Sequence, residues 1–426
     1  MNARMPSAPI TGLATSLAKK LVFDRLSRIR SGKLVIEDAE GTYVFGDDAH
    51  TSLRATITIR ESWVYLAIAT SGALGAGEAF MEGAWDADDL VAVVRIMARA
   101  AVQYSAVDTK LGELRKPVDG FLHALRRNTV SGSRKNIREH YDLGNEFFAL
   151  MLDPTMMYSA GVFERPGATM EEASIAKLDR ICKKLGLTPA DHVLEIGTGW
   201  GGFALHAAGR YGCKVTTTTI SKEQHDLAVR RIREAGLEDR ITVLLEDYRN
   251  LSGTYSKVVS IEMIEAVGDE FLPTYFGVVK KLLARDGLAL IQAITVPDAE
   301  YDAAVKSVDF VKRYIFPGCQ IPSMARMAES WAETTDFRLV SLEDLTPHYA
   351  WTLRAWRERF LENREKVAEM GYPERFLRMW EFYLAYCEGG FAERRIGDVQ
   401  ILLARPENRD LPLLPPLHDA PAIPAE

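Results

Sequence analysis

A glycine-rich turn preceded by an acid is the stretch of this sequence best suited to chemistry. It spans residues 191–202, DHVLEIGTGWGG, where an apolar run containing Glu195 ends at Gly197. This pattern predicts a buried parallel strand that turns sharply into a helix beginning near Phe203. Because glycine has no Cβ, the backbone of the turn can approach a ligand closely. A nucleotide-like ligand suits the turn best, and a tight turn without a ligand is the alternative.

The sequence lacks the acid that dinucleotide-binding enzymes have about 20 residues after the glycine motif, and this absence indicates a different nucleotide ligand. The segment GTGWGG also fits the GxGxxG pattern of dinucleotide-binding enzymes, in which a carboxylate about 20 residues later binds the ribose hydroxyls. Here that distance falls in residues 214–220, KVTTTTI, which contain no acid. The E-x-G-x-G-x-G form, with Glu195 two residues before Gly197, resembles the signature of class I S-adenosylmethionine (SAM) methyltransferases. This resemblance places Glu195 beside the cationic methionine end of SAM.

Strand and helix patterns alternate regularly around the glycine motif. We expect strands near residues 213–219, 241–245, 257–261 and 288–294, and helices near residues 221–236 and 270–283. The alternation predicts an α/β fold, a doubly wound Rossmann-like sheet of the class I SAM-methyltransferase type with a helical insertion. Ligands bind at the carboxyl ends of the strands in such sheets. Glu262 and Glu265 lie at one such end, where Glu265 could also simply offset a helix dipole.

The first 125 residues predict a separate small α+β domain. A basic helix is expected from about Leu13, followed by strands near residues 33–36, 43–45 and 55–59 and by an apolar helix through residues 91–97. The apolar side of the first helix is expected to hold Leu21, Val22, Leu26 and Ile29. This region shows no catalytic constellation.

Length and composition suggest two or three domains, because 426 residues that are 47% hydrophobic can bury a large core. We predict an N-terminal accessory domain over residues 1–125, a basic linker over 126–139, a catalytic domain over 140–405 and a Pro-rich tail over 406–426. Between Arg126 and Arg138 the chain is basic and has no acid. This composition favours either a solvated hinge or a patch that faces anionic lipid headgroups.

Charge and cysteine content exclude several classes of protein. The net charge of −7 does not point to nucleic acid or to strong attraction by an anionic membrane. The four cysteines are far apart and form no Cys/His cluster, so no metal site or disulfide framework is indicated and a reducing cytoplasm is expected. Residues 63–77, the least charged stretch, are short and glycine-rich for a transmembrane helix, and the N-terminus lacks the pattern of a signal peptide.

Residues 300–391 are unusually rich in aromatic side chains. Part of this set is expected in the core of the protein. A helical segment this aromatic could also line a long apolar pocket of the kind that an acyl chain requires.

Seven segments, in order, carry a resemblance that covers nearly the whole chain. They are HYDLGNEFFALMLDPTMMYSAGVFE, VLEIGTGWGGFALHAA, TTISKEQ, SIEMIEAVG, YIFPGCQIPS, HYAWTLRAWRERF and FYLAYCEGGFAERRIGDVQILLARP. With these segments the sequence resembles cyclopropane-fatty-acyl-phospholipid synthases and their mycolic-acid relatives. Its N-terminal region resembles the extra domain of the bacterial branch that acts on phospholipids.

The resemblance implies an activity and a set of site residues. The expected reaction transfers a carbon from SAM to the cis double bond of an unsaturated acyl chain in membrane phospholipid and forms a cyclopropane, with bicarbonate as the base. Glu265, Tyr349 and the main chain of Ile294 are expected to hold bicarbonate, with Ala160 and Gln292 beside them. The residues expected around SAM are Tyr158, Ser159, Glu195, Gly197, Gly199, Gly201, Thr219, Ile220, Gln224, Asp247, Tyr248 and Ile261. The resemblance also implies a homodimer in the cytoplasm, peripheral at the inner face of the membrane.

Two residues depart from the pattern of the family and leave the product open. Ala160 stands where many relatives have cysteine, and Gln292 stands where they have histidine. Glutamine can still donate and accept hydrogen bonds, so a bicarbonate site is retained on paper. A weaker base would let the acyl cation lose a different proton after a hydride shift, which gives a methylene-branched chain. A methyltransferase for a small soluble molecule and a catalytically inactive lipid-binding module are further alternatives.

Overall fold

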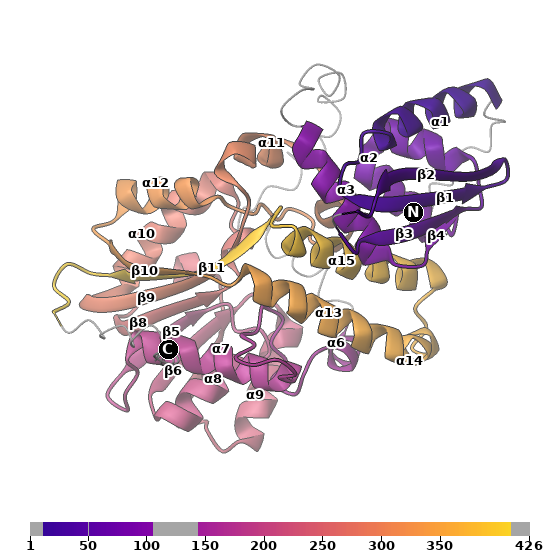
Figure 1. The fold of residues 1–426 in the computed structure, drawn as a ribbon. Helices are drawn as coiled ribbons and strands as arrows, with labels where there is room; N and C mark the ends of the chain where they lie inside the picture. Colours follow the sequence, from indigo (N-terminus) through magenta and orange to yellow (C-terminus); the bar gives the residue numbers. More distant parts are fainter. Residues whose placement is uncertain (1–11, 50, 105–143, 410–426) are drawn as a thin grey trace, which may run out of the picture. The chain divides into compact units, whose positions relative to one another are not determined.

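The computed structural model describes residues 12–49, 51–104 and 144–409 (Figure 1), which form two compact units. Unit 1 contains residues 12–104, 306–317 and 353–396, and unit 2 contains residues 144–305, 318–352 and 397–409. The predicted linker at residues 126–139 and most of the predicted tail lie outside the described residues. The domain boundaries given above therefore stay a prediction.

Unit 2 is built on a seven-stranded sheet with the order β10-β11-β9-β8-β5-β6-β7. The strands are β5 (His192–Ile196), β6 (Lys214–Thr219), β7 (Ile241–Leu245), β8 (Tyr255–Ile261), β9 (Leu283–Thr295), β10 (Arg338–Asp344) and β11 (Gly397–Ala404). Strands β9, β8, β5, β6 and β7 are parallel, whereas β11 pairs antiparallel with both β9 and β10. The predicted doubly wound α/β sheet is confirmed, and β10 is a strand that the sequence patterns did not indicate.

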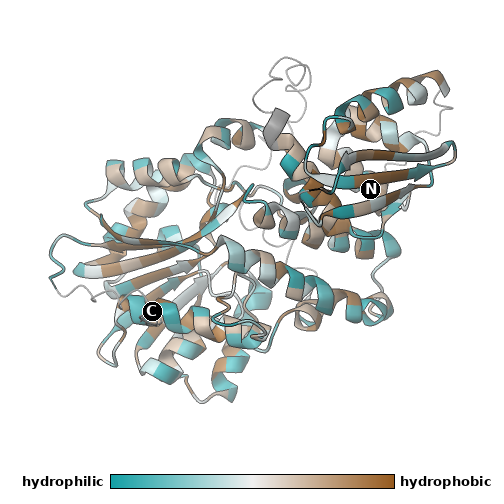
Figure 2. Ribbon diagram, in the orientation of Figure 1, coloured by the Kyte–Doolittle hydropathy of each residue, from teal (hydrophilic) through white to brown (hydrophobic). Residues whose placement is uncertain are grey.

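Helices cover both faces of this sheet (Figure 1). The helices of unit 2 are α6 (Asn145–Met151), α7 (Met170–Leu185), α8 (Gly202–His206), α9 (Lys222–Glu234), α10 (Leu272–Leu282), α11 (Tyr301–Lys306), α12 (Met324–Thr334) and α13 (Thr346–Glu362), the last of which continues into unit 1. Of these, α7, α8 and α9 pack on one face of the sheet and α10 and α12 on the other. Alternate residues of each strand face opposite sides. Val193 packs with α7, α8 and α9, whereas its neighbour Leu194 packs with α10 and α12. The strands accordingly carry long hydrophobic stretches (Figure 2).

Two helices near the glycine motif have unusual ends. The S-x-x-Q sequence at Ser221 to Gln224 is typical of a capping box, and Ser221 does cap α9 by accepting a hydrogen bond from the Gln224 backbone N–H at 3.3 Å. The Gln224 side chain does not bond back to Ser221, because its Oε1 accepts from Thr219 Oγ1 at 2.8 Å. The helix after the glycine motif is α-helical only to His206 and continues as a π-helix over Ala207–Tyr211.

Unit 1 combines segments from both ends of the chain. Its four-stranded sheet has the order β2-β1-β3-β4, with β1 (Gly32–Asp38), β2 (Gly41–Asp47), β3 (Arg54–Ile59) and β4 (Trp85–Ala87). Its helices are α1 (Gly12–Leu26), α2 (Trp63–Met81), α3 (Leu90–Tyr104), α14 (Arg364–Glu369) and α15 (Glu374–Ala392). Because α15 packs against α2 and α3, residues near the end of the chain complete the core of the N-terminal region.

The helices α1 and α2 correct two sequence-based expectations. Val22, Leu26 and Ile29 are buried as predicted, but Leu21 is 54% exposed, beside the exposed Leu13 and Leu17. The apolar stretch from Trp63 extends to a 19-residue helix with non-helical backbone at Gly72. By length and composition alone α2 could cross a membrane, a test that buried helices of soluble proteins also pass. Its C-terminal half is largely buried within unit 1.

Many of the aromatic residues after position 300 form the core of unit 1. Phe382 contacts Phe310 with ring centroids 4.7 Å apart and Phe80 at 5.7 Å. Trp380 is fully buried and packs against Tyr383. These side chains bind the C-terminal helices to the N-terminal sheet, so their enrichment has a structural explanation that needs no acyl chain.

The close contact between α15 and α3 gives a prediction on stability. A Cβ built on Gly389 would lie 2.5 Å from Val94 Cγ1, whereas one on the adjacent Gly390 would meet nothing nearer than 3.6 Å. We expect Gly389→Ala to lower the free energy of unfolding by about 1–3 kcal/mol because the stiff valine cannot move aside. Gly390→Ala is the matched control and is expected to be neutral or stabilising by up to about 1 kcal/mol, since alanine favours the helix. Urea unfolding of both variants measures the difference, and equal stabilities would contradict the close packing.

Candidate functional site

The glycine motif forms a tight turn at the carboxyl end of β5. Gly197, Gly199 and Gly201 have φ of 104°, 52° and 84°, in the region that favours glycine. The backbone N–H groups of Gly197 and Thr198 both donate to Thr218 O at 3.0 Å, which fixes the turn against β6. Gly197 and Gly199 remain partly exposed, so the turn presents its backbone outward at the edge where ligands of such sheets bind.

Glu195 is buried beneath this turn with an unsatisfied oxygen. Its side chain is 2% exposed and its Oε2 has no hydrogen-bond partner. Burial raises the pKa of Glu195 to about 8, against the lowering effects of a hydrogen bond from Thr217 and the charge of Lys177. A cationic ligand group at this position would satisfy the orphaned oxygen and favour its ionised form. The residues present therefore fit the sulfonium-bearing end of SAM.

Other predicted cofactor residues gather at the same edge of the sheet. Ile220, Tyr248 and Ile261 are partly exposed at or near strand ends, as a binding surface requires, and Tyr158 is partly exposed in the loop between α6 and α7. Thr219 and Gln224 are buried and bonded to each other, as described above. The remaining residues of the predicted set have side chains that are engaged within the protein: Ser159 accepts from Lys177 Nζ at 2.6 Å, and Asp247 pairs with Arg249 at 2.7 Å.

The carboxylate of Glu262 is the centre of a hydrogen-bond network. Its Oε1 accepts from the Ala160 backbone N–H at 2.9 Å and from Gln292 Nε2 at 2.7 Å. Its Oε2 accepts from the Tyr349 hydroxyl at 2.6 Å. Burial raises the pKa of Glu262, against the lowering effects of Lys177 and of these three donors. Three residues predicted for the catalytic site thus meet at one side chain, which was expected at a ligand-binding strand end but was given no role in catalysis.

Glu265 lies beside this network and bonds to the main chain of β9. Its Oε1 accepts from the Ile294 backbone N–H, while its Oε2 is buried without a partner. Burial, and next the charge of Glu262, raise the pKa of Glu265 to about 8. The Tyr349 hydroxyl, which was expected to hold bicarbonate together with Glu265, is bonded to Glu262.

Gln292 connects Glu262 to a second buried acid, Asp398. Its Nε2 also donates to Asp398 Oδ2 at 3.0 Å, and its Oε1 accepts from Gln400 Nε2 at 3.0 Å. Burial raises the pKa of Asp398 well above its usual value, and the charges of Glu262 and Glu265 add to the effect. The amide of Gln292 can make this link because it donates and accepts at once.

Lys177 is a buried cation that faces these acids. Its side chain is fully buried on α7, and burial lowers its pKa to about 8 against the raising effect of Glu262, Asp398, Asp153 and Glu195. Sequence reasoning missed it. The signal was its place in the buried stripe of α7, three residues after Ser174 and one before Leu178. A lysine at a core position of an amphipathic helix indicates a buried charge partner.

Bicarbonate does not fit the site as the side chains lie. Of its expected donors, Ala160 N–H and Tyr349 OH bond to Glu262, as does the Gln292 amide. The Ile294 N–H bonds to Glu265. A second anion at this point would have no such donors left and would meet two carboxylates.

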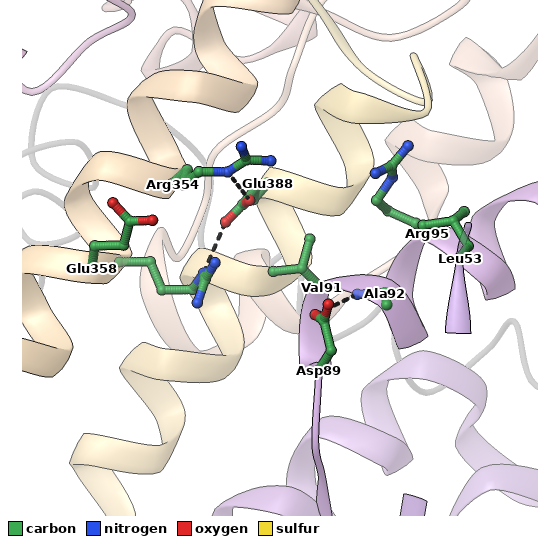
Figure 3. Close-up of a pocket in the computed structure, with 9 residues that line it drawn as sticks. Leu53, Asp89, Val91, Ala92, Arg95, Arg354, Glu358 and Glu388 are labelled. Carbon is green, nitrogen blue, oxygen red and sulfur yellow. Dashed lines mark hydrogen bonds and ion pairs between the residues drawn. The ribbon is translucent and has the colours of Figure 1, made fainter. Parts of the chain in front are cut away.

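A separate cavity in unit 1 is lined by charged residues but gathers none of the predicted site residues (Figure 3). Glu388, which is 1% exposed, accepts from Arg354 Nε at 3.1 Å and from Arg357 Nε at 2.8 Å. Asp89 accepts from the Ala92 backbone N–H at 2.9 Å. These contacts are internal and satisfy the charges concerned. Within the described part of the chain, no group of His, Cys, Asp and Glu is arranged to hold a metal ion.

Comparison with known proteins identifies the family. Residues 129–401 match the family described as mycolic acid cyclopropane synthetase. The chain belongs to this family. It is 36% identical over 95% of its length to tuberculostearic acid methyltransferase of Mycobacterium tuberculosis, covering 94% of that protein. It is also 36% identical to cyclopropane-fatty-acyl-phospholipid synthase of Escherichia coli, with 83% of this chain and 89% of that protein covered.

Solved structures agree with this assignment. A cyclopropane synthase from Mycobacterium tuberculosis is 32% identical, with a TM-score of 0.60, and covers 64% of this chain and 98% of its own. A mycolic acid cyclopropane synthase complexed with SAH and CTAB is 29% identical, with the same TM-score and coverage. The predicted family and enzyme class are confirmed: this family member is a SAM-dependent methyltransferase that acts on lipid acyl chains.

The charge of Lys177 gives a prediction on how the stability of the folded protein depends on pH. Glu195 and Glu265 have pKa values raised from 4.5 to about 8, so the folded state holds extra protons and stability falls as pH rises through that window. Lys177, with a pKa lowered from 10.5 to about 8, has the opposite effect above pH 8. We expect Lys177→Met to destabilise by about 3–5 kcal/mol at neutral pH and to keep losing stability above pH 8.

Urea unfolding from pH 6 to pH 10 measures this effect. Lys183→Met, on the same helix but with a side chain that is 70% exposed, is the control and is expected to follow the wild type. A stability curve of Lys177→Met that runs parallel to the wild type would show that Lys177 does not compensate the acids.

Proposed function

We propose that this protein transfers the methyl carbon of SAM to the cis double bond of an unsaturated acyl chain in membrane phospholipid. The observation that supports this most is the group of acids at one edge of the sheet: Glu195 near the end of β5, Glu262 and Glu265 after β8, and Asp398 at the start of β11. An apolar substrate that becomes positively charged during the reaction needs fixed negative charge in a site that excludes water. Two relatives are named tuberculostearic acid methyltransferase and cyclopropane-fatty-acyl-phospholipid synthase, and these names support a fatty acyl chain as the substrate.

The roles of the residues follow from their places in the site. When bound, SAM supplies an electrophilic methyl group. Glu195 would hold the cationic end of SAM through its orphaned Oε2. The exposed backbone of Gly197 and Gly199 would leave room for the nucleoside, with Tyr248 and Ile220 beside it. Glu265, whose Oε2 is also unpartnered, would stabilise positive charge on the acyl chain.

The proposed methyl transfer can give two different products. A cyclopropane results if the proton leaves the transferred methyl group directly, and a methylene branch results if it leaves after a hydride shift. The cyclopropane is the product expected from the family resemblance. The branched product is favoured by the likeness to tuberculostearic acid methyltransferase over 95% of the chain and by the donors that Glu262 occupies.

Lipid analysis tests the proposal directly. The protein is incubated with SAM and phosphatidylglycerol vesicles that carry one monounsaturated chain, and vesicles with saturated chains are the control. We expect only the unsaturated chains to gain the mass of one methylene group. Proton NMR then distinguishes cyclopropane protons from exocyclic methylene protons. If the unsaturated chains keep their mass while calorimetry shows bound SAM, the proposed function is wrong.

We also propose that the protein works as a homodimer in the cytoplasm, peripheral at the inner face of the membrane. Helix α1 offers a surface for the contact with the membrane. Its Leu13, Leu17 and Leu21 are 85%, 61% and 54% exposed and lie four residues apart on one side of the helix. The exposed Lys20 lies next to this row. Leucines flanked by a cation suit the interface of an anionic bilayer.

Vesicle binding tests the α1 contact. We expect Leu17→Asp to weaken sedimentation with anionic vesicles by about tenfold, because it places a carboxylate in the acyl boundary. Ser16→Asp adds the same charge to an exposed position outside the leucine row and is expected to have a smaller effect. Equal binding by the two variants would rule out the leucine row as the contact.

A further inference from the structure

The site holds an internal carboxylate where the family resemblance predicts an external anion. The Ala160 N–H, the Gln292 amide and the Tyr349 hydroxyl converge on Glu262 at 2.9, 2.7 and 2.6 Å. Donors that converge in this way from a loop, a strand and a helix form a built anion site. The occupant is a side chain of the protein itself.

The backbone of Glu262 indicates that this placement is maintained at a cost. Its φ is 48°, in the left-handed region, where a residue with a Cβ is strained by about 1–2 kcal/mol. Its N–H donates to Gln292 O at 2.9 Å, which anchors the strained residue to β9. Glycine would adopt this conformation without strain. A glutamate kept there indicates a function for its carboxylate.

The groups around Glu262 allow it to accept a proton. The acids Glu265 and Asp398 and the cation Lys177 face it, together with the Tyr349 hydroxyl. Glu262 as a whole residue is partly exposed, whereas Ala160 and Gln292 are fully buried, so Glu262 lies where the core meets the site. Its Oε2 receives one hydrogen bond, from Tyr349, and keeps a lone pair for a further proton.

We propose that the Glu262 carboxylate is the proton acceptor of the reaction, in place of bicarbonate. The inference rests on the proposed function. The π electrons of the alkene form the new bond to the methyl carbon, and the C–S bond of SAM breaks with its electron pair on sulfur. The resulting acyl cation gives one proton to Glu262 Oε2, and the C–H electron pair forms either the ring bond or the double bond of a methylene branch. The protonated carboxyl then releases its proton to solvent.

Removal of bicarbonate and of the side chain tests this proposal. In CO2-free buffer the wild-type rate is expected to stay within about twofold of its value with bicarbonate. Glu262→Gly, which suits the left-handed backbone, is expected to lower kcat by about 100-fold or more, the usual contribution of a general base. Formate or bicarbonate at millimolar concentration can enter the space left by the side chain and is expected to restore part of the rate.

Glu262→Gln is the matched variant, because it fills the same space without a base. It is expected to be as slow as Glu262→Gly and not to respond to formate. Calorimetry measures SAM binding by both variants, and binding at the wild-type affinity is the check that they are folded. A third variant, Arg394→Gly, controls for the relief of backbone strain. Arg394 lies in unit 1 and also has a left-handed backbone, with φ of 53°, so this variant is expected to keep the wild-type rate.

Two results would overturn the proposal: a wild-type rate that collapses without bicarbonate, or a Glu262→Gln variant that retains its rate. Both presuppose methyl transfer by the wild type, which is measured first. A wild type that methylates no acyl chain under any condition contradicts the proposed function itself, so the two failures are distinguishable.

Discussion

The burial of several acids at one edge of the sheet is the constraint on which the rest of the site depends. Glu195, Glu265 and Asp398 are nearly inaccessible to water, and such groups are costly unless they are hydrogen-bonded, paired or protonated. The protein meets this cost with Lys177, with the amide of Gln292 and with backbone donors. Three oxygens, Glu195 Oε2, Glu265 Oε2 and Asp398 Oδ1, remain unsatisfied. These three oxygens are the atoms at which the site can accept a positively charged group or a proton.

The parallel sheet explains why these groups meet although they are far apart in sequence. Glu195 lies one residue before the end of β5, Glu262 and Glu265 follow β8, and Gln292 lies near the end of β9. Parallel strands bring their carboxyl ends to one edge, so the positions of these residues follow from the fold. Asp398 arrives at the same edge because β11 runs antiparallel to β9 and begins where β9 ends. Loops and helices then add Ala160 and Tyr349.

The sequence predicted the strands of the sheet and the glycine turn well because their signals are local. Apolar runs, glycines at positive φ and a serine at the start of α9 each depend on a few neighbouring residues. The partners of charged groups were predicted less well because they depend on tertiary contacts. Tyr349 and Glu265 were expected to hold one bicarbonate ion, whereas the Tyr349 hydroxyl bonds to Glu262, three residues before Glu265 in the chain. Nothing in the local sequence distinguishes these two acids, whereas the strained backbone of Glu262 aims its carboxylate at the three donors.

The aromatic residues of the C-terminal half also show that local sequence does not reveal tertiary partners. Here the sequence suggested a functional role for residues that the structure places in a hydrophobic core. Their enrichment suggested a pocket for an acyl chain, yet Phe382, Trp380 and Phe391 are nearly fully buried in unit 1, where they complete the core of a sheet formed near the other end of the chain. The aromatic enrichment therefore reflects the hydrophobic core that covers this small sheet, and it does not by itself indicate an apolar substrate. The evidence for an apolar substrate that becomes cationic lies in the acids instead, because a site for a polar acceptor would not require several carboxylates to be buried around one lysine.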